Sequence, residues 1–426
     1  MTTTLPREAL PDRLRGIALL GIVVVNAAFL GISVEGFTQA SVEGAANLLT
    51  ALLVVTFAEG KFYLLFSFLF GYSASFILRD NSAPNRRRYL RRLLALFLFG
   101  FAHAVFFFVG DILITYSTLG LLLLAVSRTT DRVLRRWTIA AVALAVALIL
   151  AVMALATAFP EEGSGLGDLE TAMATGSVME VALARLEALP VFLATVFFLQ
   201  GPMAFAMFTL GLRASRTRLL ADPEAHIDLW RRMATWGWAV GLPVQAIAAG
   251  LQVSAIASGD SLSPAGAAGL ALGFITAPML TAGYIGSIAL LIARKPNFLS
   301  VMAPAGRMSL TVYIGESALL SFVFAAYGLG YFGQWGALPV VLASIASWAV
   351  LSIFAWLWMR RFTQGPLEFV LAWMTGKGRA KQAGAAVREP GKGQGGSDHD
   401  RDRRPPTHGC ETYQGIGAKS PWELPR

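Results

Sequence analysis

The sequence predicts an all-α integral membrane protein, a bundle of about ten membrane-crossing helices with both termini in the cytoplasm. The chain is 55% hydrophobic and 14% charged, with a mean hydropathy of +0.59, whereas a soluble domain carries about 25% charged residues. With the N-terminus placed in the cytoplasm, 23 of the 25 Lys and Arg residues up to residue 376 fall on cytoplasmic loops or helix ends. This asymmetry is the one that orients helices in membranes.

Apolar stretches of about 20 residues, long enough to cross a bilayer core, give the helices in order. They cover residues 14–33, 60–78, 90–109, 111–127, 138–158, 189–212, 233–257, 267–293, 308–327 and 337–359. The basic residues cluster at the cytoplasmic ends of these helices, so the net charge of +9 indicates attraction to the lipid bilayer and not to nucleic acid. Residues 34–59 and the acidic stretch 159–188 are expected to be external loops. Residues 45–57 either lie along the interface or extend the second helix.

The composition changes at residue 377. Residues 1–376 form the multi-pass domain, and residues 377–426, rich in Gly, Pro and charged residues, are predicted to be a disordered basic cytoplasmic tail. The single cysteine, Cys410, lies in this tail, so no cysteine-based metal site exists and no metal ligand is assigned. The sequence shows no internal repeat and no broken-helix pair, the marks of many secondary transporters.

Ionisable side chains inside a membrane span are costly and indicate function. His103 lies about two-thirds along 90–109, and Asp111 follows eight residues later at the external turn. Eight residues rise about 12 Å along a helix, so the two side chains meet only if Gly110 breaks the helix. A His oriented by a carboxylate is a candidate general base, and the alternative is a structural hydrogen bond between helices.

Other polar residues near the spans are candidates for binding. Glu59 and Lys61 flank Gly60 at the outer start of the second helix, where an anionic external group would meet Lys61; the alternative is a lysine that reaches outward to the interface. Glu316 sits in mid-span, three residues after Tyr313 and on the same face. These four residues are the predicted substrate-binding set.

Several stretches together resemble the YeiB-like family of bacterial membrane proteins, filed as domain of unknown function 418, with residues 230–376 as its C-terminal half. The matching segments are Asp12–Ile22 with Asn26; Gly60–Tyr63 and Leu65–Gly71; Gly100–His103, Gly110–Leu113 and Tyr116; Gly306–Thr311 with Tyr313; Tyr327–Gly330; and Gln364–Glu368. Two positions depart from the family pattern: Val312 and Glu316 stand where relatives carry Asn and Gln.

The first helix is also similar to that of membrane acyltransferases, including the heparan-glucosaminide acetyltransferase type. Those enzymes carry an Arg-Gly start, here Arg15-Gly16, and an Asn where Asn26 stands, and they move an acyl group from cytoplasmic acyl-CoA to an acceptor across the membrane. Their key His in the external segment after the first helix is absent from residues 27–59. His103 is therefore the remaining intramembrane candidate.

Three functions stay open from the sequence. In a membrane acyltransferase of the cell membrane, Arg15, Arg307 and the arginine loop 86–92 attract the phosphates of acyl-CoA as co-substrate. His103, oriented by Asp111, deprotonates an external or lipid acceptor, and Asn26 and Tyr116 polarise the thioester carbonyl. The second function is a transporter or exporter of a small metabolite or lipid precursor, and the third is a non-catalytic membrane component. The oligomeric state and the acceptor are not given by the sequence.

Overall fold

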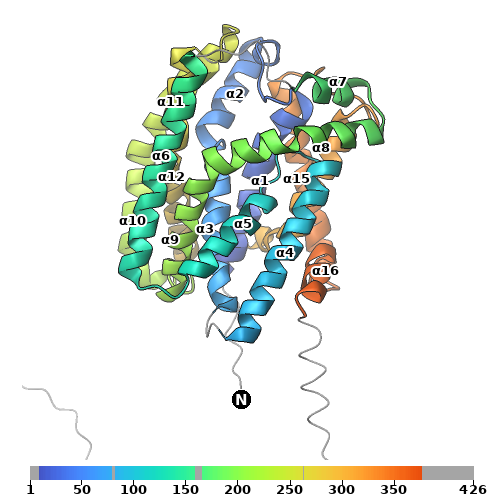
Figure 1. Cartoon of the computed structure of the whole chain (residues 1–426). Coiled ribbons are helices and arrows are strands. Elements are labelled where there is room, and N and C mark those ends of the chain that lie inside the picture. The colour runs from blue at the N-terminus through green and yellow to red at the C-terminus, as the bar shows by residue number, and fades with distance from the viewer. Residues whose placement is uncertain (1–8, 79–81, 159–165, 262, 377–426) are drawn as a thin grey trace, which may run out of the picture. The chain divides into compact units, whose positions relative to one another are not determined.

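The fold of this chain is helical throughout the part that the structure describes. The computed structural model describes residues 9–78, 82–158, 166–261 and 263–376, and no strand occurs among them (Figure 1). The predicted tail, residues 377–426, lies outside the described residues. The all-α helix-bundle prediction is therefore confirmed.

Sixteen α-helices are described, interrupted by short helical segments of other kinds. They are α1 (Ala9–Gly31), α2 (Ala45–Phe57), α3 (Phe62–Ile77), α4 (Ala83–Phe106), α5 (Leu113–Val126), α6 (Asp131–Ala158), α7 (Gly167–Thr175), α8 (Val178–Thr195), α9 (Gly201–Arg216), α10 (Ile227–Trp236), α11 (Leu242–Ala257), α12 (Pro264–Arg294), α13 (Ala303–Arg307), α14 (Ser309–Phe324), α15 (Ala337–Trp358) and α16 (Pro366–Met374). The short segments are η1 (Ala40–Val42), η3 (Glu224–His226) and η5 (Ser300–Met302), which are 3₁₀ turns, and η2 (Val196–Gln200) and η4 (Gly237–Gly241), which are π turns.

Among the described residues, eight continuous helical segments are long and apolar enough to cross a membrane, and two shorter apolar helices, α5 and α14, lie at the other two predicted spans. The predicted positions are thus occupied by helices. With 14 and 16 residues, α5 and α14 rise only about 21 and 24 Å, which is less than a bilayer core of about 30 Å. In Figure 1, α8 runs obliquely across the bundle and not parallel to its neighbours.

The membrane helices are broken at several points, which the sequence did not indicate. α2 continues into α3 through a break at residues 58–61, where Gly60 has φ +78°, a backbone conformation that favours glycine. Thus residues 45–57 do extend the second helix. The π turn η2 separates α8 from α9, and η4 separates α10 from α11. Such π turns are frequent at functional sites.

The second predicted external loop is largely helical. Residues 166–188 form α7 and the first part of α8, and α8 begins with a capping box in which Ser177 and Glu180 satisfy each other's backbone amides. The helix that the sequence begins at residue 189 therefore begins earlier, at Val178, because of this local capping signal.

α1 packs against α13, α14 and α15. Its contact with α13 depends on two glycines: a Cβ on Gly306 would lie 1.8 Å from the carbonyl oxygen of Asp12, and one on Gly16 would lie 2.3 Å from that of Met302. Small residues allow such close backbone approach between membrane helices. The family segments around Asp12 and Gly306 therefore meet in space.

The two ends of the bundle differ in charge. We call the end with Arg86–Arg92 at the start of α4, together with α16, the basic end; it is the lower end in Figure 1. The opposite end, with α7 and the start of α8, is the acidic end, where Asp168, Glu170 and Glu180 lie.

Candidate functional site

His103 and Asp111 meet in the interior of the bundle. His103 lies in the last turn of α4, which ends at Phe106, and the short connection to α5 returns Asp111 towards it. Nδ1 of His103 and Oδ2 of Asp111 are 2.8 Å apart, and both side chains are 0% exposed. α4 ends at Phe106, four residues before Gly110, so the helix break that the sequence placed at Gly110 comes earlier, and His103 and Asp111 do meet.

Asp111 has a second contact that fixes its carboxylate. Its Oδ1 accepts the backbone N–H of Ile114 at 2.9 Å, which caps the first turn of α5 in the way that an N-terminal Asp stabilises a helix. In the tautomer that carries its proton on Nδ1, His103 donates to Oδ2 of Asp111, and Nε2 is an acceptor. Nε2 is buried and has no hydrogen-bond partner among the described residues.

Tyr313 of α14 covers this pair. Its ring centroid lies 4.8 Å from that of His103. Its hydroxyl donates to Oδ2 of Asp111 at 3.5 Å and accepts the backbone N–H of Ile112 at 3.4 Å. Both bonds are long, and such hydrogen bonds are weak, so the hydroxyl is held near Asp111 without being locked there.

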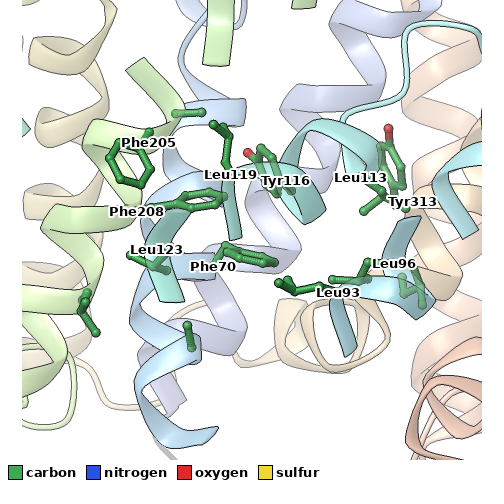
Figure 2. Close-up of a cluster of buried hydrophobic side chains, with 14 of the residues drawn as sticks. Phe70, Leu93, Leu96, Leu113, Tyr116, Leu119, Leu123, Phe205, Phe208 and Tyr313 are labelled. Carbon is green, nitrogen blue, oxygen red and sulfur yellow. The ribbon is translucent and has the colours of Figure 1, made fainter. Parts of the chain in front are cut away.

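Tyr116 is anchored more firmly. Its hydroxyl donates to the carbonyl oxygen of Tyr63 at 2.7 Å and lies 2.6 Å from Oγ of Ser67. Figure 2 shows Tyr116 beside Phe70 and Phe208, in the same apolar cluster as Tyr313. The predicted role of Tyr116 as a carbonyl polariser competes with these two bonds.

A cavity of about 340 Å³ lies at the basic end. Four arginines line it, and its single lining carboxylate, Glu368 of α16, is already committed to α14: Oε1 accepts the N–H groups of Leu310 and Thr311 at 2.7 and 3.2 Å, and Oε2 accepts the Thr311 hydroxyl at 2.6 Å. The four arginines are Arg15, Arg88, Arg92 and Arg307. The cavity is therefore suited to an anionic group.

Arg15 is positioned within this wall. Its guanidinium donates to Oδ1 of Asp12 at 3.0 Å and to the hydroxyl of Ser73. Arg15, Arg307 and two arginines of the 86–92 loop, Arg88 and Arg92, thus line one cavity together with Tyr116 and Tyr313.

A second cavity, of about 430 Å³, lies towards the acidic end. Asn26 of α1 and Glu59 from the α2–α3 break line it, and so does the π turn η2 through Gln200. Aromatic rings make up much of the remaining wall: Phe29, Phe37, Phe62, Tyr63, Phe108, Phe192, Phe274 and Tyr313.

The two cavities adjoin. Ile22, Ile112 and Tyr313 line both, and we call these three residues the septum. Because the Tyr313 ring and hydroxyl contact His103 and Asp111, the buried pair lies directly behind the septum. His103 and Asp111 are absent from the lining of either cavity, and Tyr313 is the septum residue whose side chain contacts both of them.

Two predicted residues stand apart from the cavities. Glu316 is 1% exposed, and neither carboxylate oxygen has a hydrogen-bond partner within the described residues. Lys61 is 1% exposed, and its Nζ donates to the carbonyl oxygen of Val55 at 2.6 Å. Neither lines either of the two cavities described above, and Lys61 does not reach outward to the interface.

The sequence reasoning missed the roles of Glu368 and Arg185. Glu368 was part of a family segment, but its target, the start of α14, lies 57–58 residues earlier. Arg185 is buried and donates to the carbonyl oxygen of Phe106 and the hydroxyl of Ser321 at 2.7 and 2.8 Å. The sequence did carry a signal for Arg185: it is an arginine within the acidic stretch 159–188, on the predicted external side, which is otherwise poor in Lys and Arg.

Comparisons with known proteins find relatives over most of this chain. The family model described as "Protein of unknown function (DUF418)" matches residues 214–377. The chain is 30% identical over 400 residues to the uncharacterized protein YxaH of Bacillus subtilis (strain 168), covering 87% of this chain and 94% of that protein. It is 25% identical over 398 residues to the uncharacterized protein YeiB of Escherichia coli (strain K12), covering 89% and 98% of the two chains.

Proposed function

Because the chain belongs to the YeiB-like DUF418 family of membrane proteins, we propose a function from its site: transfer of an acyl group across the cell membrane. The donor is an acyl-CoA in the basic-end cavity, and the acceptor is a nucleophile in the acidic-end cavity. The observation that supports this proposal is that both cavities adjoin at Tyr313, which contacts the buried His103–Asp111 pair.

The basic end faces the cytoplasm in this proposal, as the positive-inside rule requires. The arginines of the cavity bind the CoA phosphates, since guanidinium groups form charge-assisted, often bidentate bonds to phosphate. The apolar wall beyond them, which includes Phe66, Phe70 and Leu96, accepts the pantetheine arm and leads the thioester to the septum.

The chemistry takes place at Tyr313. The acceptor nucleophile attacks the thioester carbonyl, the C–S bond breaks, and the CoA thiolate leaves. The proton of the nucleophile passes to the Tyr313 hydroxyl as that hydroxyl gives its own proton to the His103–Asp111 pair. The pair afterwards returns one proton to the thiolate. Asn26 lines the acceptor cavity and donates its amide N–H to the carbonyl oxygen as charge develops there.

The test uses the full-length protein in liposomes with acetyl-CoA and a cell extract as the source of acceptor. Wild type is expected to release free CoA thiol, and acetyl-CoA is expected to raise its melting temperature by mass action. His103→Ala is expected to lose thiol release by about 10²–10⁴-fold, the usual contribution of a general base, while keeping the thermal shift. Arg307→Ala is expected to lose the thermal shift.

His226→Ala is the matched control, because His226 lies at the start of α10, outside both cavities. It should behave as wild type. Thiol release that persists in a folded His103→Ala variant contradicts the mechanism, and absence of any acetyl-CoA effect on wild type contradicts the donor site.

A transporter is the second candidate, favoured by the same septum. Two cavities divided by three side chains would suit alternate opening to the two sides of a membrane, and broken helices such as α2–α3 accompany transport sites. Flux of a metabolite into proteoliposomes without CoA, lost on Tyr313→Ala and indifferent to Arg307→Ala, would favour this function over acyl transfer.

A further inference from the structure

The charged residues that line the acidic-end cavity are both carboxylates. Glu35 and Glu59 line it, and no Lys, Arg or His of the described chain does. The basic-end cavity has the opposite character, with four arginines and one committed glutamate. The two adjoining cavities therefore select molecules of opposite charge.

The Glu59 carboxylate forms no ion pair with the described residues, although the charge of Lys61 acts on it through space. The only hydrogen bond of its carboxylate with the described residues is the one that Gln252 donates to Oε1 at 3.4 Å, near the limit of a hydrogen bond. Lys61 is close in sequence, but its ammonium group turns back to the carbonyl oxygen of Val55 in α2. A half-buried carboxylate in this position favours a cation or a strong donor from a bound molecule.

The backbone around Glu59 also favours positive charge. α2 ends at Phe57, two residues before Glu59, and the C-terminal end of a helix carries a partial negative charge. On another side of the cavity, the π turn η2 contributes Gln200, whose amide oxygen is a further acceptor.

The remaining wall is unsuited to a hydrated metal ion. Phe29, Phe62 and Phe274 line it, and their faces attract organic cations while offering none of the several oxygen ligands that a hard metal cation needs. A cavity of about 430 Å³ holds a molecule with a substantial apolar body.

We infer that the acidic-end cavity binds an organic ammonium ion, with its charged group on Glu59 and its apolar body against the aromatic wall. Under the proposed function this molecule is the acyl acceptor: its ammonium group first gives one proton to the Glu59 carboxylate, and the neutral amine then attacks the thioester while its second proton follows the Tyr313 route to the thiolate. Only the role of this molecule as acceptor rests on the proposed function. Its binding does not, because binding needs no acyl donor.

The test measures binding by isothermal titration calorimetry on the full-length protein in lipid nanodiscs, without CoA. Three probes share one ring and nearly one length: 2-phenylethylamine, 2-phenylethanol and 3-phenylpropanoate. The amine, a cation at neutral pH, is expected to bind about tenfold or more tightly than the alcohol, the ratio for a hydrogen bond to a charged group. The carboxylate is expected not to bind.

Two variants probe the carboxylates. Glu59→Gln should weaken binding of the amine about tenfold or more and leave binding of the alcohol unchanged. Glu35→Gln, at an exposed position, should weaken binding of the amine about twofold to threefold. This variant keeps the test decisive if Glu59→Gln does not fold. Glu43→Gln, exposed and outside the cavity, should bind as wild type.

Equal binding of amine and alcohol, or full amine affinity in either cavity variant, overturns the inference. These results are separate from those of the acyl-transfer test: His103→Ala should still bind the amine. A protein that binds the amine but shows no CoA-dependent reaction would retain this site and lose the proposed function.

Discussion

Replacement of Asp111 by Ala should destabilise the protein by about 2.5 kcal/mol. Two contacts of different kinds are lost at once. The first is the cap on Ile114 N–H at 2.9 Å, worth about 1 kcal/mol. The second is the buried bond to His103 at 2.8 Å, worth about 1.5 kcal/mol between membrane helices. Asp111→Asn keeps an oxygen for the cap, so it should cost about 1 kcal/mol less than Asp111→Ala.

The assay is reversible unfolding of the purified protein in mixed micelles, followed by helical circular dichroism as the SDS fraction rises. His103→Ala and the double variant complete a mutant cycle, whose coupling free energy should be about 1.5 kcal/mol. Asp228→Ala is the control, because the Asp228 side chain is 89% exposed and its loss should cost at most about 0.5 kcal/mol. A coupling energy of zero, or equal losses for the Asn and Ala variants, would refute the assignment.

Two further predictions concern the supports of the site. Gly100→Ala should cost about 1–3 kcal/mol by overpacking, because its Cβ would lie 2.5 Å from Oδ1 of Asp111 and 2.9 Å from the Ile114 nitrogen; Gly250→Ala, with no neighbouring atom within 4 Å, should be neutral or stabilising in the same unfolding assay. Glu368→Ala should release α16 from α14, and hydrogen exchange at the first turn of α14 should rise by about tenfold, corresponding to a loss of about 1–2 kcal/mol. Unchanged hydrogen exchange in that turn would contradict the conclusion that Glu368 holds α16 on α14.

The positions of the helices could be predicted from the sequence because hydropathy and the placement of Lys and Arg are properties of the chain in one dimension. The breaks could not, since the α2–α3 break and the π turn η2 depend on which neighbours satisfy the backbone. The early start of α8 could have been predicted, because Ser177 and Glu180 form a capping box. The acidic composition of the segment instead favoured a loop.

The sequence indicated candidate residues for the site, but not which of them lie together in space. Helix geometry separates His103 and Asp111 by about 12 Å, and only the end of α4 at Phe106 brings them together. Arg15 and Asn26 line different cavities, which their spacing along α1 permitted but did not require. Glu316 was predicted to bind substrate from its mid-span position, whereas the structure buries it outside both cavities.

The contact between Glu368 of α16 and the first turn of α14 has a consequence for biosynthesis. The ribosome completes α14 some forty residues before it reaches Glu368, and until then the amides of Leu310 and Thr311 lack the carboxylate that satisfies them in the finished protein. The wall of the arginine-lined cavity is therefore among the last features to mature, and a nascent chain cannot close it before translation of the final membrane segment has ended.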